Sequence, residues 1–142
     1  MASPLNAIQA GIYTRLTGYT ALTTVLGGSK VYDHVPQGTA APYVVIGEDT
    51  AVEFDTKTSN GWETTLTIHC WDFEAAGRKS VKTIMGHIYD ALHKNEANIT
   101  ATGFSVVYCY CEYQESFQDT TVEGALDHYY HGVLRFRVYI TE

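Results

Sequence analysis

Residues 77–95 carry the clearest helical pattern in the chain. Apolar side chains recur there at spacings of three and four, as Val81, Ile84, Met85, Ile88 and Leu92. At about 100° per residue these positions form one stripe, and polar side chains occupy the opposite side. A helix with a single apolar stripe needs one partner surface. We therefore predict that this helix packs on a sheet built from the strands before and after it.

Four segments on either side of the helix are predicted to be strands, namely residues 43–47, 62–73, 104–117 and 128–140. In the second segment Leu66, Ile68 and Cys70 share one face, and Thr65, Thr67, His69 and Trp71 share the other. In the third segment Phe104, Val106, Tyr108 and Tyr110 are expected on one face. In the last segment Leu134, Phe136, Val138 and Ile140 are expected inside, and Arg135, Arg137 and Tyr139 outside. These alternations are typical of half-buried strands.

The N-terminal part is predicted to be helical. Ser3 is expected as the N-cap, with Pro4 at the first helical position and Gly18 at the end of the helix. A second short helical turn is expected over residues 21–26, stopped by two glycines. Residues 31–35 form a short segment that is apolar at alternate positions.

Residues 48–61 are polar and end in Asn60-Gly61, a dipeptide that favours a tight turn. The length of this segment predicts a projecting hairpin arm. Residues 118–127 are predicted to be a polar connection between the last two strands.

These elements predict one α+β domain spanning residues 1–142. We expect a four-stranded, mainly antiparallel sheet with helices packed on one face, in the order α-β-β-α-β-β, plus the hairpin arm. The other face carries Thr, His, Trp, Tyr and Arg and is too aromatic to be merely solvated. We expect that face, or the free sheet edges, to be covered by another subunit.

The chain has 16 acidic and 9 basic side chains and a net charge of −7. Binding to a phosphate backbone needs clustered Lys and Arg, so this balance argues against a nucleic-acid-binding protein. An odd number of cysteines, 3, provides no disulfide framework. There is no signal-peptide pattern and no apolar run near the 18 or so residues that span a membrane. We expect a cytosolic, reduced, soluble protein without membrane contact.

Two pairs have the spacing of metal ligands, and each has a plainer interpretation. His128 and His131 lie three residues apart on a predicted strand, where they point to opposite faces. Cys109 and Cys111 share a face about 7 Å apart, with no second pair nearby. Strand packing explains both pairs.

His87, Asp90 and His93 form a row along the exposed side of the central helix. The row could hold a divalent ion in a small metal-dependent enzyme or ligand-binding domain, although a solvated helix face is the plainer interpretation. Cys70 follows His69, but adjacent strand residues diverge, so they do not form a nucleophile and base. There is no P-loop and no dinucleotide-binding motif. We predict no catalytic residue, no metal and no cofactor.

Two motifs make the chain resemble a known family. They are residues 31–38, Val-Tyr-Asp-His-Val-Pro-Gln-Gly, and residues 42–47, Pro-Tyr-Val-Val-Ile-Gly. Around them stand Leu-Thr-Gly-Tyr-Thr-Ala-Leu at 16–22, a threonine-rich strand at 63–71 and His-Gly-Val-Leu-Arg-Phe-Arg at 131–137. The ordered set resembles the tail-terminator, or tail-completion, family of long-tailed bacteriophages and gene transfer agents over nearly the whole chain.

The resemblance implies a structural protein without catalytic residues. Such proteins form a ring, usually hexameric, that caps the tail tube, ends tube growth and joins the tail to the head. The implied partners are other copies of the chain, the tail tube protein, a head-side connector or stopper protein, and DNA that passes through the bore without specific binding. The implied location is the head–tail junction of a particle assembled in the bacterial cytoplasm. A head-closure or minor connector ring protein is the near alternative.

A ring is a closed, head-to-tail interface, for which sheet edges and an aromatic face are suitable material. The residues expected at subunit or partner interfaces are Glu53, Phe54, Asp55, Trp71, Arg135, Arg137 and Tyr139. The net charge of −7 also predicts an acidic bore that repels phosphates.

Overall fold

The computed structural model describes residues 3–73, 77–119 and 129–142. In chain order the elements are α1 (Leu5–Thr17), α2 (Thr20–Leu26), β1 (Val31–Tyr32), β2 (Tyr43–Glu53), β3 (Gly61–Phe73), α3 (Gly77–Leu92), the 3-10 turn η2 (Glu96–Asn98), β4 (Ser105–Asp119) and β5 (Tyr129–Thr141). Most of the predicted connection at 118–127 lies outside the described residues, although β4 itself continues to Asp119.

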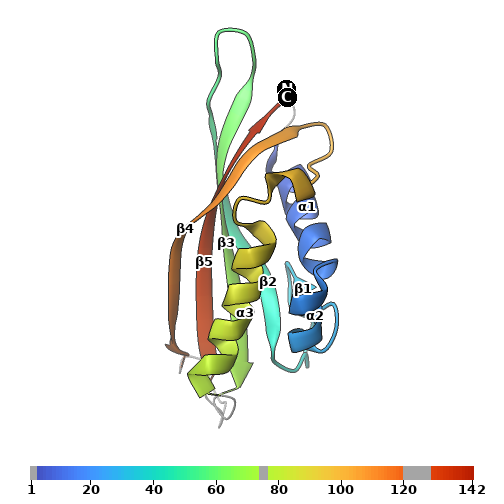
Figure 1. Ribbon diagram of the computed structural model, residues 1–142, viewed down its shortest axis with the longest axis vertical. Coiled ribbons are helices and arrows are strands. Elements are labelled where there is room, and N and C mark those ends of the chain that lie inside the picture. Colours follow the sequence, from blue (N-terminus) through green and yellow to red (C-terminus); the bar gives the residue numbers. More distant parts are fainter. Residues whose placement is uncertain (1–2, 74–76, 120–128) are drawn as a thin grey trace.

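The sheet has five strands in the order β1-β2-β3-β5-β4, with helices on one face only (Figure 1). The four predicted strands pair antiparallel, as expected. The predicted strand count is wrong because β1 joins the edge in parallel, with Val31 opposite Val44 and Tyr32 opposite Val45. Two residues are too short to show a strand period, so the pattern of residues 31–35 could not place them in the sheet.

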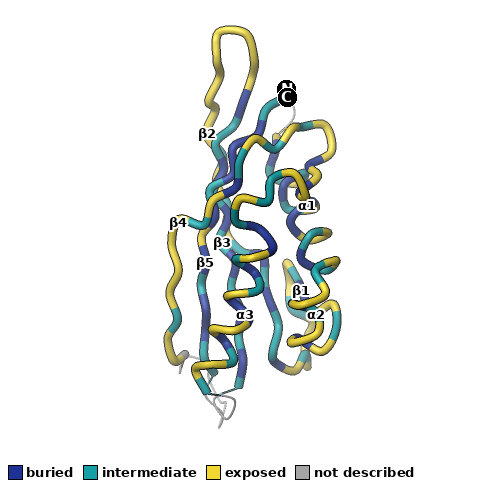
Figure 2. The backbone as a smooth tube through the Cα atoms, in the orientation of Figure 1, coloured by how far each residue is buried: buried dark blue, intermediate teal, exposed yellow. Residues whose placement is uncertain are grey.

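The core lies between the sheet and the helices (Figure 2). The predicted stripe of α3 is buried in full, from Val81 to Leu92. The inward side chains predicted for β3 and β5 are also buried, and Phe136 at 0% exposure is the bulkiest side chain of the core. Here the hydrophobic periods of the sequence and the packing of the fold agree.

The N-terminal helix begins one residue later than predicted. Pro4, not Ser3, is the N-cap of α1, and no side chain caps the helix. Gly18 ends α1 as predicted, and Gly27 ends α2 in the left-handed conformation with φ 77°. Proline has no backbone N–H to satisfy, so it is tolerated at a helix start without a capping partner.

The predicted hairpin arm is confirmed. Strand β2 extends further into the arm than predicted, to Glu53. Strands β2 and β3 continue past the body of the sheet and project from one end of the molecule (Figure 1). The predicted Asn60-Gly61 turn is wrong, since the tip is a turn from Thr56 to Ser59, closed by the Thr56 N–H donating to the Ser59 carbonyl at 2.8 Å. Gly61 instead opens β3.

Strand β4 departs from the predicted alternation because it contains two β-bulges. The first lies between Val106 and Tyr108, and the second between Cys111 and Tyr113. Each bulge adds one residue and moves the following side chains to the other face. Val106 therefore packs on the core while Tyr108 and Tyr110 face away from it, so the prediction that they share one face is wrong.

Cysteine burial gives a prediction about thiol reactivity. Burial raises the pKa of Cys70 and of Cys109 to about 12, and it raises the pKa of the half-buried Cys111 as well. Thiolates are the reactive form, so we expect iodoacetamide at pH 8 to leave Cys70 and Cys109 unmodified and to label Cys111 slowly. Mass spectrometry of the native and the guanidinium-unfolded protein checks this. Rapid labelling of Cys70 before unfolding would contradict it.

Candidate functional site

The side of the sheet without helices, here called the outer face, gathers most of the predicted interface residues. Strand β3 contributes His69 and Trp71, and β5 contributes Arg135, Arg137 and Tyr139. They are brought together by the β3–β5 register, which pairs Trp71 with His131 and Thr67 with Arg135. The face divides into an ionic cluster, a histidine–aromatic cluster and the base of the arm.

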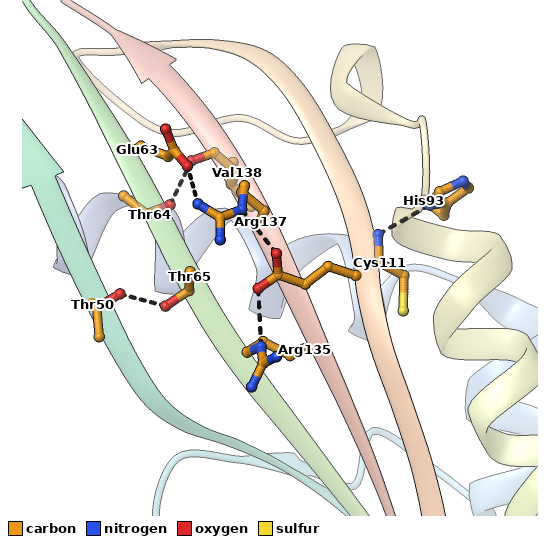
Figure 3. A network of polar contacts seen from close by, with 10 residues as sticks. Thr50, Glu63, Thr64, Thr65, His93, Cys111, Arg135, Arg137 and Val138 are labelled. Carbon is orange, nitrogen blue, oxygen red and sulfur yellow. Dashed lines mark hydrogen bonds and ion pairs between the residues drawn. The ribbon is translucent and has the colours of Figure 1, made fainter. Parts of the chain in front are cut away.

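The ionic cluster joins both predicted arginines (Figure 3). Glu112 accepts a hydrogen bond from Arg135 Nε at 2.9 Å and another from Arg137 Nε at 2.8 Å. Arg137 also donates to Glu63, and the Arg135 guanidinium lies 5.2 Å from the ring centre of Tyr113. Each partly exposed pair stabilises the fold by at most about 1 kcal/mol. Two arginines thus face two carboxylates, and the cluster carries no net charge.

Sequence reasoning missed Glu112 because its side of the sheet depends on the first β-bulge, between Val106 and Tyr108. Strict alternation from Val106, which packs on the core, would put residue 112 on the inner face. In the structure Tyr113 also faces outward, opposite Arg135. Knowledge of the cross-strand register was needed to see that one carboxylate meets both arginines.

The histidine–aromatic cluster surrounds Trp71. His131 stacks on Trp71 with ring centres 4.3 Å apart, and its Nε2 lies 2.8 Å from Nδ1 of His69. His69 Nε2 in turn lies 3.0 Å from a carboxylate oxygen of Glu48. Burial raises the pKa of Glu48, but hydrogen bonds from its own backbone and from His69 outweigh burial and leave the pKa lowered. The cluster ties β2, β3 and β5 together.

The base of the arm is fixed by Tyr139. Its hydroxyl donates to the Phe54 carbonyl at 3.1 Å, and its ring meets the Phe54 ring edge-on with centres 5.3 Å apart. On its other side Tyr139 stacks on Tyr108. Tyr139 is only 9% exposed, whereas Glu53, Phe54 and Asp55 are exposed. Of the predicted interface residues, the exposed ones are therefore the three on the arm and Arg135.

Gly61 allows this close contact and gives a second prediction. A Cβ at Gly61 would lie 2.6 Å from the Tyr139 hydroxyl and 2.9 Å from the Phe54 carbonyl oxygen. We expect Gly61→Ala to lower the free energy of unfolding by about 1–3 kcal/mol, as measured by urea denaturation. Adding Tyr139→Phe, which removes the crowded hydroxyl, should recover part of that loss.

A control for Gly61→Ala is available on α3. A Cβ at Gly86 would meet nothing within 4 Å, and Gly86 is exposed. Gly86→Ala should therefore stabilise the protein by about 0.5–1 kcal/mol through helix propensity. Equal losses at the two glycines would contradict the steric argument.

The row of His87, Asp90 and His93, considered above as an ion site, does not lie entirely on the helix. His93 lies just beyond α3, where its Nδ1 accepts a hydrogen bond from the Cys111 N–H at 3.0 Å and its ring stacks on Tyr89. No group of three His, Cys, Asp or Glu side chains within residues 3–73, 77–119 and 129–142 could hold a metal ion. Of the His128 and His131 pair, His128 lies outside the described residues. His93 covers the edge of β4 near the end of the helix.

Comparison with solved structures defines the class of fold. The chain is similar to a chain in the solved virion of a native gene transfer agent particle, with a TM-score of 0.84 and 22% sequence identity. The match covers 100% of both chains. No curated protein sequence gives a significant match. The fold is thus shared, over its whole length, with a chain of a gene transfer agent particle.

The family model described as tail completion protein gp17 matches residues 10–141 of the chain. The chain belongs to this family and is a structural protein of a phage-type tail. The family predicted from residues 31–47 and their neighbours is confirmed. Within the described residues, no helix is long and apolar enough to cross a membrane.

Proposed function

We propose that the protein forms a ring, of six subunits by family resemblance, that caps the tail tube, ends tube growth and joins the tail to a head-side connector. Membership of the tail completion family over residues 10–141 is the observation that carries this proposal. The particle would be assembled in the bacterial cytoplasm, with this ring at its head–tail junction. The partners would be further copies of the chain, the tail tube protein and the connector or stopper protein.

Two surfaces suit such contacts. The arm exposes Val52 at 65% and Phe54 at 54%, the highest values among the exposed large apolar side chains of the described residues. Strand β4 is the last strand of the sheet and exposes Tyr110, Tyr113 and Phe117. Contiguous exposed aromatic surface is typical of protein interfaces. We propose that Glu53, Phe54 and Asp55 make direct contacts, and that Trp71, Arg135, Arg137 and Tyr139 support the outer face.

DNA would pass through the bore without specific binding. Arg135 and Arg137 are paired with Glu112 and Glu63. These two arginines therefore do not form an unpaired positive patch on the outer face. The net charge of −7 also disfavours adhesion to phosphates. An acidic lining of the bore therefore stays our expectation for the assembled ring.

Electron micrographs of particles produced without this protein test the proposal. We expect overlong tubes and heads that are not joined to tails. Light scattering of the purified protein, alone and mixed with tail tubes, should detect the ring. Tails of normal length attached to heads in the absence of the protein would overturn the proposed function.

A further inference from the structure

An open groove lies between α3 and the C-terminal half of β4, here called the α3–β4 groove. It is lined by Lys82, Met85, Gln114, Glu115 and Ser116 and has a volume of about 200 Å³. Lys82 is exposed and places a positive charge on the helix side, and the mostly buried Met85 lies at the floor of the groove. Because β4 is the last strand of the sheet among the described residues, one of its edges has no strand neighbour there. A groove beside an open strand edge can receive an extended segment of a partner.

The hairpin arm has the properties of such a segment. Beyond Glu53 it is exposed throughout (Figure 2), and it presents the apolar ring of Phe54. It carries two acidic side chains, Glu53 and Asp55, followed by one basic side chain, Lys57. The acidic residues are complementary in charge to Lys82 on the helix side of the groove. Apolar anchoring by one aromatic side chain, flanked by complementary charges, is how many protein interfaces obtain both affinity and orientation.

The arm and the groove lie at opposite ends of the molecule. Figure 1 shows the arm projecting from the upper end of the long axis, whereas the start of α3 and the end of β4 lie at the lower end. The arm of a subunit therefore cannot reach its own groove, and the contact must join two copies. A contact between two different surfaces of the same chain is head-to-tail, which is the type of interface that closes a ring.

We propose that the hairpin arm of one copy docks in the α3–β4 groove of the next copy, with Phe54 as its apolar anchor. This inference rests on the proposed ring and names the surface that receives the arm. It also accounts for the exposure of Phe54, which is held at the arm base by its contact with Tyr139 but keeps 54% of its surface accessible.

Photo-crosslinking in assembled particles tests the contact directly. p-Benzoylphenylalanine replaces Phe54, and a control variant carries it at Tyr13, an exposed aromatic position on α1. A mixture of isotopically light and heavy copies identifies cross-links between subunits by mass spectrometry. We expect position 54, and not position 13, to link to residues around Lys82 or Gln114–Ser116 of another copy. Links to the tail tube protein or to another part of the chain, or no links at all, would overturn the inference.

A charge exchange provides the second test. Lys82→Glu and Glu53→Lys should each reduce the yield of joined particles at least about fivefold, and the double variant should return to within about twofold of the parent. Lys94→Glu is the matched control, because Lys94 is exposed near the other end of the helix. If Lys82→Glu behaves like Lys94→Glu, or if the double variant shows no recovery, the docking site is wrong. Rings that still form in those variants would leave the proposed function standing.

Discussion

Replacing Phe136 by alanine is expected to lower the free energy of unfolding by about 3–5 kcal/mol. Phe136 is fully buried and is the bulkiest side chain of the core. It lies on β5, the strand between β3 and β4, opposite Leu66 on one neighbour and Cys111 on the other. Truncation removes the transfer free energy of the ring and leaves a cavity that a sheet paired on both sides cannot close. Because domains of this size are stable by about 5–15 kcal/mol, much of the total would be lost.

Urea denaturation of the parent and the variant measures this effect, and the midpoint of thermal unfolding should fall by roughly 10–20 °C. Phe54→Ala is the matched control, since the same atoms are removed from a side chain that is 54% exposed. That change should cost less than about 1 kcal/mol. If the two variants lost equal stability, the burial of Phe136 between the sheet and the helices would be contradicted.

The elements with a complete hydrophobic period were predictable from the sequence. The stripe of α3 and the alternation of β3 and β5 each require burial of one face, so the pattern determines the side of every residue. The two-residue strand β1 was not predictable, because its pairing with Val44 and Val45 is a tertiary contact. Propensity could not place the arm turn either, since Asn60-Gly61 favours a turn but the strand register puts the tip at Thr56 to Ser59.

The candidate site was predictable only in part. The outward positions of Arg135 and Arg137 follow from the alternation of β5, and the exposed arm follows from its polar composition. Glu112 joins them only because the first bulge in β4, between Val106 and Tyr108, shifts the register, and one inserted residue leaves no signature in composition. The histidine–aromatic cluster depends on three strands meeting, so His69 and His131 gave no sign of their contact in the sequence.

Shortening the hairpin arm is expected to abolish assembly while leaving the fold intact. Glu53 pairs with Trp62 in the β2–β3 ladder, so residues 54–61 can be replaced by a two-residue Asn-Gly turn that suits this antiparallel pair. The removed residues contribute no side chain to the core, but they contact the end of β5 through the Phe54–Tyr139 pair, the Gly61–Thr141 pairing and two hydrogen bonds between Asn60 and Glu142. We expect the free energy of unfolding to fall by about 2–4 kcal/mol, because a few hydrogen bonds and one aromatic contact are lost while the core is kept.

The same variant should reduce joined particles by at least about a hundredfold, because a ring fails when every one of its identical contacts is weakened together. Particle yield and tube length in cells that supply only the shortened chain measure this, with the thermal unfolding of the purified variant as the control for folding. Lys57→Glu, which changes the tip but keeps the arm, should have a smaller effect because Phe54 remains in place. A shortened chain that still terminates tubes and joins heads would show that the arm is not an interface, and the ring would then have to close through the β4 edge and the outer face.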